Sequence, residues 1–402
     1  MSEPRPRLAD YEGIAPPGSL VLIRRLAESL EGHTFLHVNS TREGGGVAEI
    51  LSRLLPLLDE VGIRTRWEVI DGEAEFYAAT KRIHNTLQGA DAPLTPQMKE
   101  AYLAASERAA TRLDLVADTV MIHDPQPAPL VARREDGSRW IWRCHIDLSH
   151  PQRRTWTFLA PHVGRFDSAI FHLAEFSPRL PIPSYLIHPS IDPLSDKNRE
   201  LPPLEVERRV AALGVPLDRP LLLQVSRFDP FKDPMGVIRA FRLVRQHRDC
   251  VLVLAGGGAS DDPEGTETLA RVREEAGDDP DIHVLLLPSD AHLDINALQR
   301  AATIVIQKSL REGFGLTVAE AMWKGKAVIG GAAGGITKQL VDNVTGHLVH
   351  SVEGCAYAIR RLLGNAAERE RMGILARESA RSQLLITRHL IDYLQLLRLH
   401  AS

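Results

Sequence analysis

The chain has 402 residues, of which 44% are hydrophobic and 25% are charged, and its formal net charge is -4. This composition is typical of a globular protein, and the slightly acidic balance argues against a protein that wraps nucleic acid. No apolar run approaches the roughly 20 residues of a membrane span, and the N-terminus lacks the apolar core of a signal peptide. The three scattered cysteines form neither a disulfide framework nor a metal-binding spacing, which predicts a cytoplasmic protein.

A chain of this length normally divides into two domains of about 200 residues each. Residues 188–203 contain four prolines and several charges, which is typical of a linker. We therefore expect an N-terminal domain over residues 1–190 and a C-terminal domain over residues 191–380. The last helix, within residues 381–402, is apolar on one side and is expected to pack back on the first domain.

The first half alternates short apolar strands with helices, which predicts a parallel α/β domain. Strands are expected at residues 34–39, 64–70, 119–123, 140–145, 168–171 and 185–187, with helices at 20–30, 47–61, 73–88 and 96–115. Ligands of such domains bind at the carboxyl ends of the strands. The residues after these strands are therefore of interest: a glycine run at Gly44, Gly45 and Gly46, then Asp124 with Gln126, then His145. Taken singly, each histidine fits a structural role at least as well.

The second half repeats the alternation, which predicts a second parallel sheet. Strands are expected at residues 221–225, 251–254, 282–287, 303–306 and 327–330, separated by helices near 205–213, 234–247, 265–276, 292–301, 317–324 and 353–363. A final helix is expected near residues 387–400. The fold class predicted from both halves is α/β with two Rossmann-like domains.

The stretch from residue 306 to 336 joins a strand, a glycine-rich loop and a helix that begins near Leu316 or Thr317. A helix N-terminus offers unpaired N–H groups and partial positive charge, which suits a phosphate. Glu312 and Glu320 lie at the two ends of this loop-and-helix segment. An alternative is that Thr317 and Glu320 only form a capping box, S/T-x-x-E, that closes the helix end.

Two cations follow the first strand of the second half. Arg227 and Lys232 lie between that strand and the next helix, where a ligand is expected. An isolated pair of this kind is usually solvated. Beside a second helix N-terminus and two glutamates at the same sheet edge, the pair instead predicts a diphosphate cradle.

The spacing of the two glutamates does not favour a glycoside hydrolase, which needs two carboxyl groups about 5 to 9 Å apart. Glu312 and Glu320 would be about 12 Å apart in a continuous helix. A nucleotide sugar carries its own leaving group, and electrostatic stabilisation of the departing diphosphate then suffices. Asp279 and Asp281 have the D-x-D spacing of some metal sites but lie in a polar turn, so no protein metal site is predicted. Any Mg²⁺ is expected on the diphosphate itself.

The stretch EGFGLTVAE, from Glu312 to Glu320, resembles the paired-glutamate signature of the family-four retaining nucleotide-sugar glycosyltransferases. That resemblance implies the GT-B fold, in which two Rossmann-like domains with parallel sheets face each other across a cleft that closes on the substrates. Other stretches, HVNSTREGGGVAEIL, HDPQP, WRCHIDLSHP and SRFDPFKDPMGVI, are similar to the trehalose-forming glycosyltransferring synthases. The resemblance covers nearly the whole chain.

The resemblance implies a reaction between NDP-glucose (ADP-, UDP- or GDP-glucose) and glucose that gives α,α-trehalose, reversibly and with retention of anomeric configuration. It implies a front-face mechanism without a protein nucleophile, and no required cofactor. The implied site residues are Arg227 and Lys232 for the diphosphate, Glu312 and His145 for the transferred glucose, Glu320 for the ribose, Leu316 and Thr317 as amide donors, Gly45 and Gly46 for the donor, and Asp124 and Gln126 for the acceptor.

Three alternatives remain open from the sequence. One is a trehalose phosphorylase, and another is a synthase with glucose 6-phosphate as acceptor, for which Arg42, Arg153 and Arg154 could supply the cations. The third, from a different class, is a non-catalytic nucleotide-sugar sensor. The nucleobase, the metal dependence, the physiological direction and the oligomeric state, including a homodimer, are not decided by the sequence.

Overall fold

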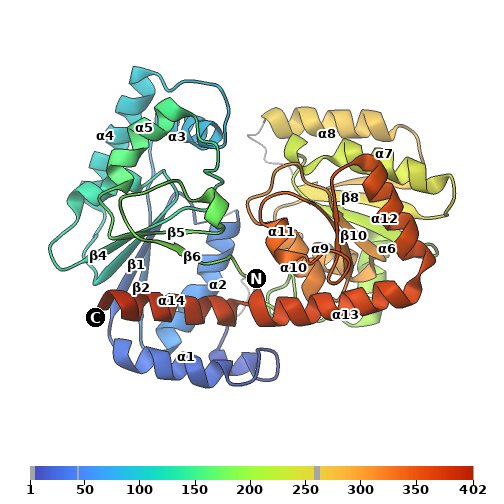
Figure 1. Cartoon of the computed structure of the whole chain (residues 1–402), viewed down its shortest axis with the longest axis horizontal. Helices are drawn as coiled ribbons and strands as arrows, with labels where there is room; N and C mark the ends of the chain where they lie inside the picture. The colour runs from blue at the N-terminus through green and yellow to red at the C-terminus, as the bar shows by residue number, and fades with distance from the viewer. Residues whose placement is uncertain (1–4, 43–44, 258–262, 402) are drawn as a thin grey trace. The chain divides into compact units, whose positions relative to one another are not determined.

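The computed structural model describes residues 5–42, 45–257 and 263–401. The chain forms two compact units. The first unit comprises residues 5–189 together with 386–401, and the second comprises residues 190–385. In the described residues each unit contains one six-stranded parallel sheet with helices packed against it, which confirms the predicted α/β class (Figure 1).

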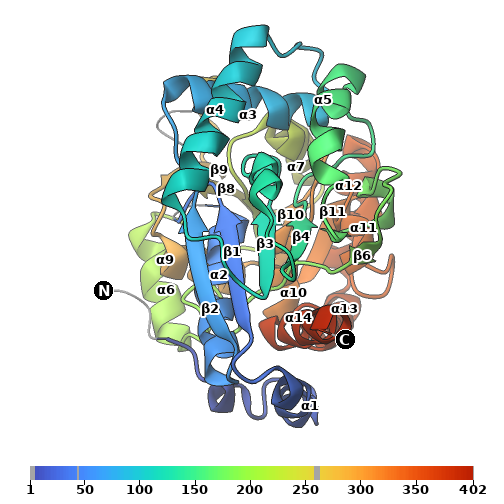
Figure 2. The ribbon, with the colours of Figure 1, turned by 90° about the vertical axis from the view of Figure 1, so that its left-hand side faces the viewer.

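The strands of the first unit lie in the order β2-β1-β3-β4-β5-β6, and every neighbouring pair is parallel. Figure 2 shows β2, β1, β3 and β4 side by side. The bounds are β1 (Thr34–Asn39), β2 (Arg64–Val69), β3 (Thr119–His123), β4 (Arg139–Arg143), β5 (Ser168–Phe171) and β6 (Ser184–Leu186). Because all strands point the same way, the residues that follow β1, β3, β4 and β5 are brought to a single edge of the sheet.

Helices cover both faces of this sheet. They are α1 (Ser19–Ala27), α2 (Gly46–Glu60), α3 (Ala74–Leu87), α4 (Pro96–Arg112), α5 (Arg153–Val163) and α14 (Ile386–Ala401), with short 3-10 helices η1 (Leu8–Tyr11), η2 (Glu28–Leu30), η3 (Ala128–Arg133) and η4 (Ala174–Phe176). On one face, Leu36 and Trp142 join a core with side chains of α3, α4 and α5. On the other face, Phe35 and His37 contact Tyr393 of α14. The first and last α-helices of this unit lie side by side, since α14 packs along α1 (Figure 1).

The strands of the second unit lie in the order β12-β11-β10-β7-β8-β9, again all parallel. They are β7 (Leu221–Val225), β8 (Val251–Gly257), β9 (Ile282–Leu287), β10 (Ile304–Gln307), β11 (Ala327–Gly331) and β12 (His347–Val349). The helices are α6 (Pro203–Ala212), η5 (Pro230–Lys232), α7 (Pro234–Arg245), α8 (Pro263–Ala276), α9 (His292–Ala301), α10 (Leu316–Trp323), α11 (Ile336–Gln339), α12 (Val352–Gly364) and α13 (Ala366–Gln383). Apolar side chains of β7, β8 and β10 form its core with α7 and α12.

The segment interpreted as a linker is packed rather than loose. Asn198 is 1% exposed, and its amide donates to the Asp192 carbonyl at 3.0 Å. Asn296 of α9 donates to the backbone carbonyls of Asp196 and Arg199 at 2.8 and 2.9 Å. The backbone here is irregular but ordered, because side-chain amides satisfy buried carbonyl groups that have no partner in a helix or sheet.

Besides the short 3-10 helices, four elements were not predicted, namely α5, α11, α13 and β12. The polar composition of α13 hides its few buried positions, and β12 is only three residues long. Among the described residues, no helix is both long and apolar enough to cross a bilayer.

Candidate functional site

Lys232 and Glu312, 80 positions apart in the sequence, meet at the carboxyl edge of the second-unit sheet. The Lys232 ammonium donates to Oε2 of Glu312 at 2.7 Å, and the side chains are 18% and 8% exposed. Lys232 ends the short helix η5, which Asp229 caps by accepting from the Phe231 N–H at 2.8 Å. Glu312 lies in the loop after β10, the strand that pairs with β7. Neighbouring strands thus bring together two of the predicted site residues.

A chain of polar side chains links this ion pair to α10. Ser309 donates to the same Oε2 of Glu312 at 3.0 Å, and Gln307 donates to Ser309 Oγ at 3.1 Å. Thr317, in the first turn of α10, donates to Gln307 Oε1 at 3.3 Å. We call Lys232, Glu312, Ser309, Gln307 and Thr317 the Lys232–Glu312 cluster. Gln307 and Ser309 were missed by the sequence reasoning, although their spacing of two at a strand end places them on one face.

The backbone that carries Lys232 is fixed from two sides. Gln224 of β7 donates to the Lys232 carbonyl at 2.7 Å. Asp233, with a left-handed φ of 51°, caps α7 by accepting from the Gly236 N–H at 3.1 Å. The Asp233 carboxylate also pairs with Lys308, which is 5% exposed. This second ion pair therefore holds the end of β10 against the start of α7.

The start of α10 has the geometry that an anion needs. Gly315 is its N-cap residue, with φ of +85°, and no side chain caps the helix. A Cβ at Gly315 would lie 3.2 Å from Glu312 Cγ, so glycine allows the loop to pass close to the glutamate. The capping-box alternative is wrong, because the Thr317 hydroxyl donates to Gln307 rather than capping the helix. Leu316 and Thr317 occupy the first turn, where N–H groups point out of the helix.

Glu320 is buried, at 2% exposure, and lies on the covered side of α10. Its Oε2 accepts from Nε2 of Gln299 at 3.0 Å. One turn later, burial lowers the pKa of Lys324 to about 7, while the Glu320 carboxylate acts to raise it. Lys324 donates to Asn198 Oδ1 at 2.9 Å. No motif identified Gln299, because it lies inside α9 without a distinguishing neighbour.

Arg227 is less closely integrated. Its side chain is 66% exposed, and Nη2 lies 3.3 Å from Asp229 Oδ2. The structure therefore brings Lys232, Glu312 and Thr317 into one hydrogen-bonded cluster and places Arg227 on the same β7–α7 connection, reaching into solvent. A diphosphate role for Arg227 stays a prediction.

In the first unit, Asp124 and His145 meet at the carboxyl edge of the sheet. The backbone N–H of His145 donates to Asp124 Oδ1 at 2.7 Å, and the indole N–H of Trp142 donates to the Asp124 carbonyl at 2.9 Å. Asp124 has a left-handed φ of 65°, and burial raises its pKa to about 7. Two residues on, Oε1 of Gln126 is buried and has no hydrogen-bond partner in the described part of the chain. A carboxyl and an amide thus lie close to each other, as expected for a sugar-binding edge.

The ring of His145 is already engaged on both sides. Its Nε2 lies 2.9 Å from Nδ1 of His123, and its Nδ1 lies 3.2 Å from Nε2 of His172. A ring contact with the transferred glucose would require one of these bonds to be exchanged. The predicted role of His145 therefore stays a prediction. The engagement of its ring by other histidines was not foreseen, because His123 ends β3 and His172 follows β5, 22 and 27 positions away in the sequence.

The glycine loop of the first unit lies before α2. Gly45 has φ of +82° with open space where a Cβ would be, and Gly46 begins α2. Gly44 lies outside the described residues. The contribution of this loop to a donor site stays a prediction.

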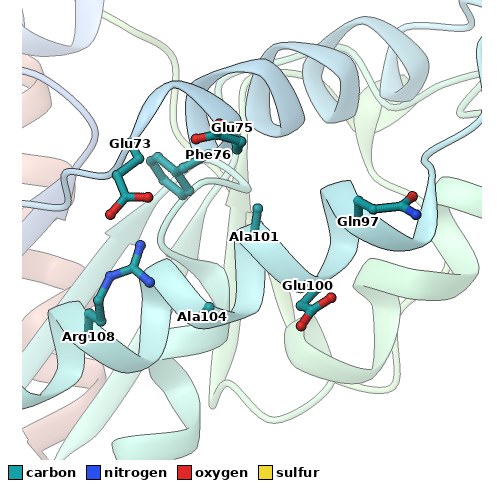
Figure 3. Close-up of a pocket in the computed structure, with 8 residues that line it drawn as sticks. All are labelled: Glu73, Glu75, Phe76, Gln97, Glu100, Ala101, Ala104 and Arg108. Carbon is teal, nitrogen blue, oxygen red and sulfur yellow. The ribbon is translucent and has the colours of Figure 1, made fainter.

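A surface pocket of about 220 Å³ lies between α3 and α4 of the first unit, away from the predicted residues. Figure 3 shows the Arg108 and Glu73 side chains pointing toward each other, with Glu75, Gln97 and Glu100 nearby. Its charged lining residues are three glutamates and one arginine, so its net charge is negative and does not suit a diphosphate.

Two observations bear on metals. Asp281, of the D-x-D spacing, pairs with Arg219 at 2.6 Å and with Arg245, and its N–H donates to Asp279 Oδ1 at 3.0 Å. This arrangement explains the two carboxylates as parts of a turn. Across the described residues, no group of three His, Cys, Asp or Glu side chains is arranged to hold a metal ion.

Comparison with known proteins assigns both halves. Residues 37–178 match the family described as trehalose synthase, N-terminal domain, and residues 206–379 match glycosyl transferases group 1. The chain is 45% identical over 397 residues to the trehalose synthase of Pyrococcus horikoshii, covering 97% of this chain and 96% of that protein. It is 28% identical to the trehalose phosphorylase of Pleurotus pulmonarius, covering 85% of this chain and 54% of that protein.

A similar fold is found in the UDP-forming α,α-trehalose-phosphate synthase of Burkholderia xenovorans, with a TM-score of 0.71 and 17% identity. The match covers 92% of this chain and all of that one. At this identity the likeness shows the fold alone, which is GT-B, as predicted. With nearly the whole length aligned at 45% identity, this chain belongs to the trehalose synthase family of group 1 glycosyltransferases.

Proposed function

We propose that the protein is a retaining glucosyltransferase that forms α,α-trehalose from NDP-glucose and glucose. The observation that carries the proposal is the Lys232–Glu312 ion pair beside the uncapped start of α10. A cation and a helix N-terminus offer positive charge to a diphosphate, while a carboxylate offers an acceptor to sugar hydroxyls. An NDP-sugar presents these two chemistries in one molecule.

The donor is held by groups that differ in kind. Lys232 and the amides of Leu316 and Thr317 neutralise the charge that develops on the departing diphosphate, and Arg227 swings in from solvent as a further cation. Lys232 and Ser309 both donate to Oε2 of Glu312, which leaves Oε1 to accept a glucose hydroxyl. Because the donors are fixed before the reaction, little reorganisation is needed when charge moves onto the phosphate.

The nucleoside half of the donor is assigned to Glu320. A carboxylate accepts two hydroxyl groups of a ribose diol well, and Gln299 holds it in place without neutralising its charge. A phosphorylase has no ribose to bind, so Glu320 favours a nucleotide-dependent enzyme over the phosphorylase alternative.

The acceptor is assigned to Asp124 and Gln126 of the first unit. Near neutral pH, Asp124 exchanges between an acceptor-only and a donating form, because its pKa is raised to about 7. The Gln126 Oε1, buried without a partner in the described residues, gains a hydrogen bond when a glucose hydroxyl arrives. The acceptor then attacks on the face that the diphosphate leaves, and the leaving phosphate oxygen takes its proton. No protein nucleophile takes part.

A product screen with four donors (ADP-, UDP- and GDP-glucose and glucose 1-phosphate) and two acceptors (glucose and glucose 6-phosphate) tests this proposal. We expect a disaccharide from an NDP-glucose and glucose, with both anomeric protons in the α configuration by NMR. A product only from glucose 1-phosphate, or no product at all, would contradict the proposal.

A further inference from the structure

Four histidines of the first unit form a continuous hydrogen-bonded row. Nδ1 of His37 lies 2.9 Å from Nε2 of His123, and Nδ1 of His123 lies 2.9 Å from Nε2 of His145. Nδ1 of His145 lies 3.2 Å from Nε2 of His172. His37, His123 and His172 are buried, at 0%, 2% and 4% exposure, and His145 is the half-buried member of the row.

The order of the strands explains the row. His37 is in β1, His123 ends β3, His145 follows β4, and His172 follows β5. These four strands are neighbours in that spatial order, β1-β3-β4-β5. The row therefore crosses the sheet at right angles to its strands, one histidine per strand. It has no counterpart in the linear sequence, where the four residues are 22 or more positions apart.

The surroundings keep these rings uncharged. Burial lowers the pKa of His37 to about 3 and lowers the pKa of His123 and His145 well below the usual value. The Arg143 guanidinium, 0% exposed, acts in the same direction on His123 and His145. From α14, the pKa of His389 is also lowered, chiefly by burial and next by Arg388, while that of Tyr393 is raised by burial. The Asp124 carboxyl group lies next to His145 and accepts from its backbone N–H.

In a hydrogen-bonded row of neutral imidazoles, every ring must carry its proton on the same kind of nitrogen. Each ring has one N–H and one bare nitrogen, so a reversal within the row would set two N–H groups or two lone pairs face to face. Two arrangements of the row are therefore allowed: all four rings carry the proton on Nδ1, or all four carry it on Nε2. Nε2 of His37 is buried and has no hydrogen-bond partner in the described residues. The Nδ1–H arrangement places a bare nitrogen at this end of the row and an N–H at the His172 Nδ1 end, and the Nε2–H arrangement reverses the two. The geometry therefore requires one tautomer common to the whole row without selecting which of the two it is.

We propose that His37, His123 and His172 are positioning residues that hold His145 as a neutral imidazole in a single tautomer, the one shared by the whole row. The consequence for the reaction rests on the proposed function. The backbone N–H of His145 donates to Asp124, so a row that holds the His145 ring in place also steadies the residue to which the acceptor carboxyl group is bound. The row then connects the core of the first unit to the acceptor-binding residues through rigid, uncharged links.

The proposal is tested first on the wild-type protein, independently of activity. Long-range ¹H–¹⁵N NMR of histidine-labelled full-length protein reports the tautomer and charge of each ring. We expect His37, His123 and His145 as neutral rings at pH 7 that share one tautomer, all Nδ1–H or all Nε2–H, and that are still neutral at pH 6. A charged His145, or rings of unlike or mixed tautomers, would overturn the proposal whatever the enzyme makes.

Two variants at the buried end then separate positioning from folding. His37→Leu removes the hydrogen bond to His123, whereas the amide of His37→Asn retains a polar group near the position of Nδ1. We expect His37→Leu to lower kcat roughly tenfold, the loss typical when a partner that orients a histidine is removed, and to shift the acid limb of its pH profile toward 6.5, the ordinary value for histidine. His37→Asn should restore both. An equal loss in both variants would assign His37 a packing role only.

His33→Asn is the matched control. His33 precedes β1 at the opposite edge of the sheet, where its Nε2 lies 3.0 Å from the Thr119 hydroxyl, and burial lowers its pKa too. It should leave the His145 signals and kcat unchanged. If no donor and acceptor pair gives a disaccharide, the proposed function fails, while the NMR measurement still decides whether the row holds His145.

Discussion

The carboxyl edges of the two sheets differ in the charge of their polar side chains. In the second unit, Lys232 pairs with Glu312 and Lys308 pairs with Asp233, so that charge is matched by charge. In the first unit, the corresponding edge carries a row of neutral imidazoles and a carboxyl group whose pKa is raised to about 7. The difference follows the proposed ligands, because a diphosphate needs formal positive charge and a sugar hydroxyl does not.

The comparison also explains where charge is tolerated. Burying an ion pair is feasible when each member has further hydrogen bonds, as Glu312 has from Ser309. Arg143 is a buried cation without a hydrogen-bond partner for any of its three nitrogens in the described residues. Its charge instead acts on the neighbouring rings, where it opposes protonation.

The largest effect is expected from Lys232→Ala. The variant removes the cation assigned to the departing diphosphate, and we expect kcat/KM to fall by about 10²- to 10³-fold, the usual loss for one transition-state donor. The exposed Lys338→Ala of the same unit serves as control and should retain full activity. Unchanged turnover in Lys232→Ala would show that the charged edge is only structural.

Acid should unfold the first unit steeply. His37, His123, His145 and His389 have pKa values lowered in the folded state, so the unfolded chain binds more protons below pH 6.5 and stability falls as the pH falls. Four such groups give a slope of roughly 5 kcal/mol per pH unit, reduced by roughly 1.4 by Asp124, whose raised pKa acts in the opposite sense between about 4 and 7. Urea unfolding from pH 7.5 to 5.0 measures this slope. A flat profile would contradict a row of neutral histidines.

Glu320→Gln should act on the donor alone. Loss of the carboxylate weakens binding of a ribose diol, and we expect the KM for the NDP-glucose to rise about tenfold, as for a lost hydrogen bond to a charged group. The KM for glucose should not change. An equal rise for both substrates would place Glu320 outside the nucleotide site.

The smallest effect is expected from Arg143→Met, which tests what this buried cation contributes to stability and to the pKa values of the neighbouring histidines. A buried cation without hydrogen bonds costs stability, so an apolar side chain of similar length is expected to raise the free energy of unfolding by about 1 kcal/mol or leave it unchanged. The pKa of His123 and His145 should rise, because Arg143 helps to lower both. A large loss of stability would contradict this and show that the Arg143 guanidinium makes a stabilising interaction in the folded protein.

Much of this architecture follows from local sequence patterns. Apolar strands such as β1 and β7 and the loop from Glu312 to Gly315 were predicted because their signals are contiguous. The family resemblance identified the charged residues Lys232 and Glu312, whose meeting also follows from the order of parallel strands. Membership of the family and the fold are confirmed, whereas the roles of individual residues stay predictions.

What escaped prediction depends on contacts between distant segments. Gln299 and Gln307 act through one amide each and have no motif. The histidine row depends on the spatial order of β1, β3, β4 and β5, and singly each histidine fits a structural role. The ordered packing of the proline-rich segment before α6 was not foreseen, because it comes from Asn296 of a helix about 100 residues later.

The most direct test of the central claim runs the reaction backward. Trehalose is incubated with a nucleoside diphosphate or with inorganic phosphate, and the glucosyl product is separated by chromatography. We predict NDP-glucose with at least one of ADP, UDP or GDP, loss of that product in Lys232→Ala, and no product with phosphate. Glucose 1-phosphate formed from phosphate, with no NDP-glucose from any nucleotide, would contradict a charged edge built for a nucleotide leaving group.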